Sequence, residues 1–244
     1  MLLNDTGEAR LASAKLGTMW HSQVVVLASI SVSLLTTLGA VLLVLGGSPG
    51  GGVGMLLLAL AGLLCALVGS ILYLVGLYGM RPLDGDYGRA FSLSILHIVL
   101  GLIADFMEEG SALYQLLDLV TSVLAVVVMW LAVQATDRLL VQAGREELRG
   151  RGRTAFWLTA AAMALTCGTG FFTALLADLD GAEAGGLVVL LIALILSFTG
   201  TILYILYLRS ASLAMAAYAL EGTRRLEAEL ARERGTDGSL GDRR

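Results

Sequence analysis

The chain has 244 residues, of which 57% are hydrophobic and only 15% are charged. Soluble globular domains are about one-half apolar and one-quarter charged, so this composition excludes an ordinary soluble domain and predicts an integral membrane protein. The net charge of −4 gives no indication of a nucleic-acid partner. The two cysteines each lie within an apolar run, which is not the pattern of a secreted disulfide framework.

Apolar runs along the chain predict six transmembrane helices, because a helical span needs about 20 predominantly apolar residues. In chain order they cover Val24–Leu45, Met55–Met80, Phe91–Met107, Ala112–Thr136, Ala155–Ala177 and Gly186–Leu208. The first run is too long for the apolar region of a signal peptide, so we expect it to be retained. The predicted fold is all-α and polytopic, with the six helices arranged as three hairpins.

Three parts follow from this pattern: a cytoplasmic N-terminal segment (1–22), the transmembrane bundle (23–208), and a cytoplasmic helical extension with a disordered tail (209–244). Asp5 and Glu8 have the spacing of a helix capping box, which favours a short interfacial helix over Thr6–Trp20. After the fourth span, an arginine-rich segment favours an amphipathic continuation of that helix over residues 138–153.

The distribution of positive charge predicts the orientation. All sixteen Lys and Arg residues fall on one side of a six-span arrangement, and positively charged loops remain in the cytoplasm. The charged residues of the loops on the other side are all acidic, namely Asp105, Glu108, Glu109, Asp178, Asp180 and Glu183. Trp20, Trp130 and Trp157 all fall at the positively charged ends of spans, where indoles prefer the headgroup level. We therefore expect a plasma (inner) membrane protein with both termini in the cytoplasm.

Two spans share a short motif that favours an internal repeat. Gly69–Leu74 (GSILYL) in the second span matches Gly200–Ile205 (GTILYI) in the sixth, and Thr121–Leu124 in the fourth is a weaker copy. Each copy lies at a similar depth in a helix of the same direction. Parallel repeats of this kind are typical of pseudosymmetric membrane bundles, although apolar helices can also resemble one another by composition alone.

The stretch Leu67–Phe91 resembles a motif of uncharacterised prokaryotic multi-span membrane proteins. In that motif a G-x-I-L-x-L-x-x-L-Y helix end precedes a short polar loop and a Y-x-x-x-F entry to the next span. The matching residues are Gly69, Ile71, Leu72, Leu74, Leu77, Tyr78, Tyr87 and Phe91. The resemblance covers about a tenth of the chain and implies a membrane protein without an assigned activity.

Three ionisable side chains lie within or at the end of apolar runs: His97, Asp105 and Asp118. An aspartate at the centre of a span costs about 2.5–3.5 kcal/mol on insertion scales, so such residues are candidates for function. One interpretation is a proton or cation path from the two aspartates inward to His97, because histidine can exchange protons near neutral pH. The other is that both aspartates are interfacial and that His97 bonds to a neighbouring helix.

Hydroxyl-bearing and small residues give a second set of candidates. Hydroxyls that line a solute path or pack between helices are Ser29, Ser33, Thr36, Thr159, Thr166 and Thr173. Small residues that allow close approach of helix backbones are Gly62, Ala66, Gly69 and Gly200.

No catalytic or metal-binding motif is recognisable, so no cofactor or metal is predicted. Three functions stay open: a non-catalytic subunit, scaffold or regulator of a membrane complex, a small ion, proton or solute channel or transporter, and an intramembrane enzyme acting on lipid or quinone. The charged C-terminal helix favours the first, as a surface for a protein partner or a second copy. The repeat, the hydroxyls and His97 favour the second.

Overall fold

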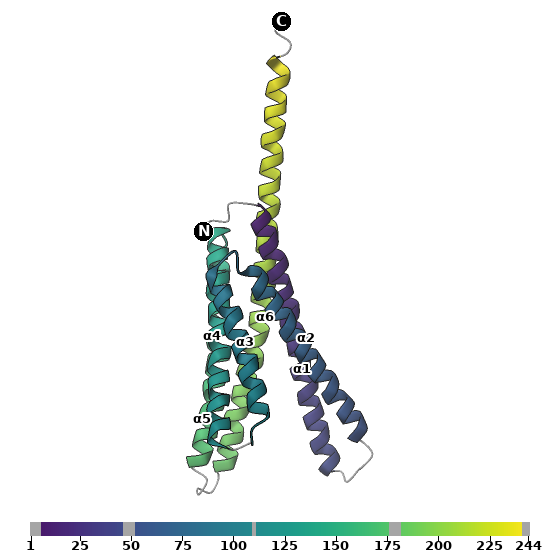
Figure 1. Ribbon diagram of the computed structural model, residues 1–244, viewed down its shortest axis with the longest axis vertical. Coiled ribbons are helices and arrows are strands. Elements are labelled where there is room, and N and C mark those ends of the chain that lie inside the picture. Colours follow the sequence, from purple (N-terminus) through teal and green to yellow (C-terminus); the bar gives the residue numbers. More distant parts are fainter. Residues whose placement is uncertain (1–5, 46–51, 109–110, 176–181, 241–244) are drawn as a thin grey trace.

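The computed structural model describes residues 6–45, 52–108, 111–175 and 182–240. Side chains are described over most of the same ranges. The exceptions are most positions in the helix ends next to residues 46–51 and 176–181, and the positions beyond residue 232. The described chain is helical and contains no strand (Figure 1). Its elements are α1 Thr6–Leu45, α2 Gly52–Met80, α3 Gly85–Asp105, α4 Ala112–Gln142, the 3-10 helix η2 Glu146–Leu148, α5 Arg149–Leu175 and α6 Ala182–Leu240.

The helix ends follow local rules of capping and turn formation. Asp84 caps α3 by accepting a hydrogen bond of 2.9 Å from the amide of Asp86. Ser111 caps α4 in the same way, accepting from the amide of Tyr114. At the other end of α4, Gly144 has a φ of +70°, a left-handed conformation that suits glycine and ends the helix.

Two predicted boundaries differ from the structure. The predicted helix Thr6–Trp20 is not a separate element, because α1 runs without interruption from Thr6 into the apolar span. The predicted continuation over residues 138–153 is correct only as far as Gln142, since the chain turns at Gly144 and begins α5 at Arg149. In addition, α6 reaches Leu240, which is further than the sequence indicates.

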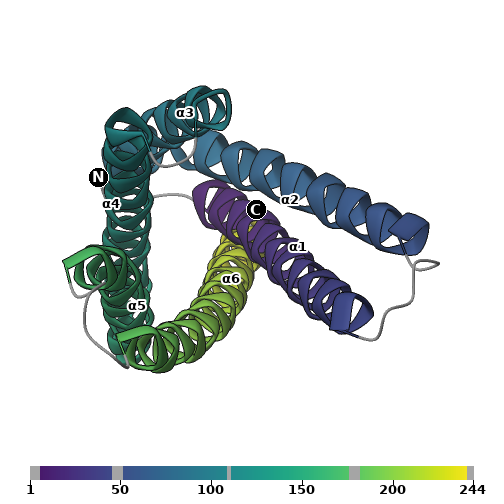
Figure 2. The same ribbon diagram turned by 90° about the horizontal axis from the view of Figure 1, so that it is seen from below.

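The six helices form a ring in chain order. Each helix contacts the next one along the chain, and α6 returns to contact α1. Figure 2 shows this ring end-on, and Figure 1 shows that the α1–α2 pair diverges from the other helices at the end remote from the termini. At the opposite end α6 projects well beyond the other helices.

Five described helical stretches are long and apolar enough to cross a membrane: Thr6–Thr36, Leu57–Met80, Gly85–Asp105, Ala112–Gln142 and Val188–Arg232. These stretches, which are taken from the described residues only, do not include α5, whose first turns carry Arg149, Arg151 and Arg153. The predicted all-helical fold is confirmed, and the apolar helices are compatible with the predicted multi-pass membrane protein. The predicted acidic turn residues Glu109, Asp178 and Asp180 lie outside the described residues.

The packed core lies at the end of the ring near the two termini. Its largest fully buried side chains come from five helices and are Leu16, Met19, Leu77, Met80, Tyr87, Val133, Thr136, Leu140, Tyr207, Leu208 and Met215. Large apolar side chains towards the other end are mostly exposed, for example Leu35 at 66% and Leu63 at 67%. Such an apolar surface is expected where lipid tails surround the helices.

Candidate functional site

A cavity of about 320 Å³ lies where the six helices meet, and every one of them contributes to its wall. Its lining is Gln23 of α1, Ser70, Tyr73 and Leu74 of α2, Ser94, His97 and Ile98 of α3, Ala125, Val128 and Met129 of α4, Thr159 of α5, and Thr201 and Tyr204 of α6, together with Val26. More than half of these residues are polar, yet none is Asp, Glu, Lys or Arg. We call this the central cavity.

Two hydroxyls at matching positions of the repeated motif meet at the edge of the central cavity. The hydroxyl oxygens of Tyr73 and Tyr204 lie 3.2 Å apart and share a hydrogen bond. The preceding motif residues Ser70 and Thr201 also line the cavity. Each copy of the sequence motif therefore contributes one serine or threonine and one tyrosine to the central cavity, from helices that are far apart in the sequence.

Buried polar contacts close the ring on the side of the termini. One helical turn beyond Tyr204, the fully buried Tyr207 donates a hydrogen bond of 2.8 Å to Asp137 Oδ1. The hydroxyl oxygens of Tyr87 and Thr136, both fully buried, lie 2.7 Å apart. These four side chains are almost completely buried, and none of them lines the central cavity; we call them the tyrosine layer.

Polar groups remain available inside the central cavity. Ser94 Oγ is buried and has no hydrogen-bond partner within the described residues. One turn further along α3, His97 Nδ1 lies 3.0 Å from the backbone carbonyl oxygen of Thr121, so one ring nitrogen is engaged with α4. A buried hydroxyl without a partner is unfavourable unless a bound molecule or water satisfies it, which makes Ser94 a candidate ligand contact.

The other two ionisable candidates do not join His97. Asp105 ends α3 and Asp118 lies two turns into α4, and both side chains are exposed and outside the lining of the central cavity. Of this trio, the structure therefore places only His97 at the cavity. The contact between His97 and Thr121 is the interhelical bond that the alternative interpretation of this histidine describes.

The predicted hydroxyls fall into two groups. Thr159 lines the central cavity, and Ser29 donates a hydrogen bond of 2.6 Å across to the carbonyl of Gly62 on α2. Thr36 and Thr166 bond carbonyls one turn back on their own helices, and Ser33 lies against Gly62. The side chain of Thr173 lies outside the described residues.

The predicted small residues lie mainly at helix contacts. A Cβ atom added at Gly69 would lie 2.6 Å from a methyl group of Val26 on α1, and one at Gly200 would lie 2.5 Å from Thr159 Oγ1 on α5. Gly62 is buried against α1, whereas Ala66 is partly buried. The helices of the first and last pairs can approach closely because glycine stands at these positions.

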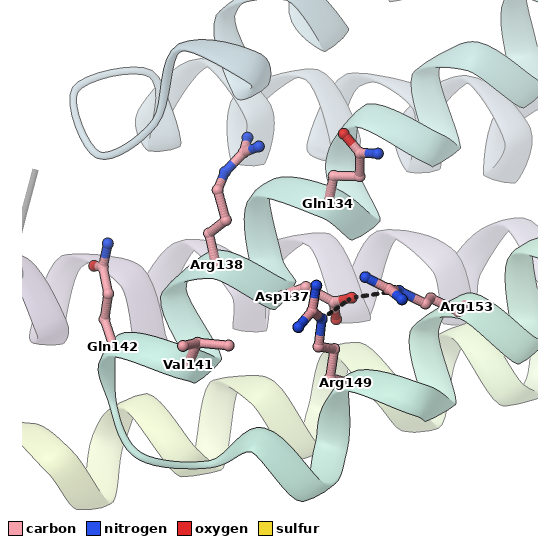
Figure 3. A pocket seen from close by; sticks show the side chains of 7 residues that line it. All are labelled: Gln134, Asp137, Arg138, Val141, Gln142, Arg149 and Arg153. Atoms are coloured by element: carbon pink, nitrogen blue, oxygen red, sulfur yellow. Dashed lines mark ion pairs between the residues drawn. The ribbon is translucent and has the colours of Figure 1, made fainter.

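A second cleft, of about 490 Å³, opens on the side of the termini and was not foreseen from the sequence (Figure 3). Its lining is Gln134, Asp137, Arg138, Val141, Gln142, Arg149 and Arg153. Asp137 is only 3% exposed, and its Oδ2 atom lies 3.3 Å from Arg153 Nε and 3.7 Å from Arg149 Nε. We call this the arginine cleft.

In the wall of the arginine cleft, Arg138 is held by the α2–α3 turn. It donates hydrogen bonds of 2.7 and 2.9 Å to the two carboxylate oxygens of Asp84, and another to Asp86. Burial alone would raise the pKa of Asp84, but the hydrogen bonds from Arg138 and from the Asp86 amide outweigh it and hold the pKa below its usual value. This contact ties the start of α3 to α4.

Sequence reasoning missed Asp137, which lies two helical turns past Trp130 and directly before an arginine, at the end of an apolar run where a solvated aspartate is the common case. Within the described residues, no three His, Cys, Asp or Glu side chains lie close enough to hold a metal ion.

Comparison of the chain with protein-family models, with curated proteins and with solved structures finds no match in any of the three. The function is therefore inferred from the two sites themselves.

Proposed function

We propose that this protein is a small transporter or channel of the cell membrane that binds an uncharged, hydrogen-bonding solute in the central cavity. The observation that carries the proposal is a cavity of about 320 Å³ at the junction of all six helices, with hydroxyl, amide and imidazole groups set in a mainly apolar wall. Small-molecule sites in proteins have volumes of about 300–1,000 Å³. Polar groups within a membrane bundle are typical of substrate pathways.

The chemistry of the lining favours an uncharged solute. The wall offers hydroxyl, amide and imidazole groups but no carboxylate, ammonium or guanidinium group to balance an ion. Bringing an unpaired ion into such a site costs far more than bringing in a neutral molecule. Ser94, Tyr73 and Thr201 can supply the hydrogen bonds that orient the solute, and the ring nitrogen of His97 that does not face Thr121 can supply another.

The wider arrangement proposed here is a six-span bundle of three hairpins with cytoplasmic termini. The location of all sixteen Lys and Arg residues supports this orientation. Support for a true repeat comes from the two equivalent glycines, Gly69 and Gly200, which each pack on the preceding helix, and from the bonded pair Tyr73 and Tyr204. In this arrangement the tyrosine layer is the cytoplasmic barrier below the central cavity.

A flux measurement tests the proposal. The purified protein is reconstituted into liposomes, and swelling is followed with urea, glycerol and sorbitol as probes. We expect faster entry of at least one probe than into protein-free liposomes, and a loss of at least tenfold in Ser94→Leu, which fills the cavity. The matched control is Ser92→Leu on the exposed face of the same helix, which should keep the wild-type rate. Equal rates in protein and protein-free liposomes, or equal losses in both variants, would contradict the proposal.

A second candidate function, a scaffold or regulatory subunit, is favoured by the projecting end of α6. Near its projecting end, α6 contacts the start of α1 through the hydrogen bond of 2.9 Å from Arg10 to Thr223 and the packing of Gly222 on Thr6. Beyond them Leu226 and Leu230, four residues apart on one face, are both about half exposed, at 51% and 52%. Deletion of residues 226–244 should then abolish co-purification of a protein partner while leaving flux unchanged.

A further inference from the structure

The arginine cleft lies outside the central cavity and has no part in the proposed solute site. Its wall comes from the end of α4 and the start of α5, which the turn at Gly144 folds back against each other (Figure 3). Three of its seven lining residues are arginines, and only Asp137 is acidic. Two glutamines, Gln134 and Gln142, add amide groups to the same wall.

Arg149 and Arg153 are not saturated by Asp137. Both approach the same carboxylate oxygen, at 3.7 and 3.3 Å, and this oxygen accepts no hydrogen bond within the described residues. The other oxygen accepts from Tyr207. Each guanidinium has five N–H donors, and both side chains are about half exposed, at 50% and 47%. One carboxylate thus holds two arginines in place while most of their donors still face the cleft.

The position of these arginines on α5 sets their depth. Arg149, Arg153 and Trp157 stand at i, i+4 and i+8 and therefore share one face of the helix. Trp157 is 64% exposed, and indoles of membrane proteins prefer the headgroup level. The two arginines lie one and two turns further towards the termini, at the depth of lipid phosphates on that side. The first-turn amides of α5 add partial positive charge at the same place.

We propose that the arginine cleft binds the phosphate group of an anionic phospholipid of the cytoplasmic leaflet, with Arg149 and Arg153 as the principal donors. Guanidinium groups bind phosphate oxygens in bidentate fashion, and basic pockets at the cytoplasmic side of membrane helices are typical lipid headgroup sites. Asp137 orients the arginines in the empty site and competes with the phosphate for them. The proposal uses the membrane orientation given above but not the transport of a solute.

Thermal unfolding of the full-length protein in neutral detergent micelles tests this site, with phosphatidylglycerol, phosphatidylcholine and inorganic phosphate as probes. We expect phosphatidylglycerol to raise the Tm in a concentration-dependent manner, because a ligand that binds only the folded state stabilises it. Phosphatidylcholine and inorganic phosphate should have little effect. The combined change Arg149→Gln with Arg153→Gln should weaken the apparent affinity for phosphatidylglycerol by about tenfold or more. Arg151→Gln, an exposed arginine of the same turn outside the cleft lining, is the matched control and should bind as the wild type does.

A variant that is expected to raise the affinity for phosphatidylglycerol keeps the test valid if the double variant unfolds. Asp137→Asn retains a carbonyl oxygen for Tyr207 but removes the charge that competes for the arginines, so it should bind phosphatidylglycerol more tightly than the wild type. Equal stabilisation by phosphatidylcholine, equal stabilisation by inorganic phosphate, equal loss in Arg151→Gln, or no gain in Asp137→Asn would each overturn the lipid site.

Discussion

At the scale of single residues, the buried polar contacts set the geometry of both sites. Asp137 is almost fully buried, and Tyr207 connects it to the tyrosine layer below the central cavity. The sequence could identify His97 as unusual because it interrupts an apolar run. It could not identify Asp137, because this residue stands at the junction of a span and a charged segment, where a solvated aspartate is the common case.

Tyr207→Phe tests the importance of the tyrosine layer. Removal of the hydroxyl leaves Asp137 Oδ1 without its donor inside the packed core. We expect the free energy of unfolding in detergent micelles to fall by about 1–2 kcal/mol. Tyr78→Phe, at an exposed tyrosine of α2, should change it by less than about 0.5 kcal/mol. Equal free energies of unfolding for the two variants would show that the tyrosine layer does not stabilise the fold.

Gly200→Ala tests the close approach of α5 and α6. The added Cβ atom would lie 2.5 Å from Thr159 Oγ1 and 3.1 Å from the Thr159 amide nitrogen, so the helices must separate. We expect a loss of about 1–3 kcal/mol in the free energy of unfolding. At Gly101, within α3, an added Cβ meets no atom within 4 Å, so Gly101→Ala should be neutral or stabilise by up to about 1 kcal/mol. A stabilised Gly200→Ala protein would show that the helices are not in contact at this glycine.

At the scale of helices and turns, the sequence predicts helices well and their ends less well. Apolar runs locate the six helical regions because each run is too long for any other element. The end of α4 is different, since the helical pattern of charges continues past Gln142 and only the left-handed conformation of Gly144 stops the helix. The cap at Asp84 is likewise visible as a residue type, but its second function, holding Arg138 of α4, depends on the fold.

Asp84 gives the α2–α3 turn a dependence on pH. Its pKa is lowered in the folded protein, so the stabilisation is fully present above the ordinary aspartate pKa of about 3.9 and is lost as the pH falls through the lowered value. Asp84→Asn keeps a capping side chain but removes the charge that holds Arg138. At pH 7 we expect this variant to be less stable than the wild type by about 0.5–1 kcal/mol, because Arg138 is half exposed and the pair is screened.

The measurement is the difference in free energy of unfolding between wild type and Asp84→Asn as a function of pH. The difference should shrink below about pH 4, whereas Glu147→Gln, in an exposed pair with Arg145 at 3.7 Å, should show no difference at any pH. A constant difference for Asp84→Asn across the whole pH range would indicate that capping geometry rather than charge is responsible.

At the scale of the whole molecule, the ring of helices depends on contacts between distant parts of the chain. Arg10 bonds Thr223, and Tyr73 bonds Tyr204, across separations of 213 and 131 residues. No local pattern predicts these pairs, so neither the closure of the ring by α1 and α6 nor the central cavity could be derived from the sequence. The repeated motif indicates that the second and sixth helices are related, but it does not say that their tyrosines meet.

The proposed orientation can be tested by cysteine accessibility in a Cys65→Ala, Cys167→Ala background. In intact cells, a membrane-impermeant maleimide should label Glu108→Cys between α3 and α4 but not Arg151→Cys or Arg225→Cys. Inside-out vesicles should give the reverse result. The reason is that six spans place α5's first turn and the α6 extension on the same, positively charged side. If Arg151→Cys and Arg225→Cys were labelled from opposite sides of the membrane, the chain would cross the membrane an odd number of times between these two positions. The arginine cleft and the α6 extension would then no longer share the cytoplasmic side, and the lipid site would have to be reassigned to the other leaflet or abandoned.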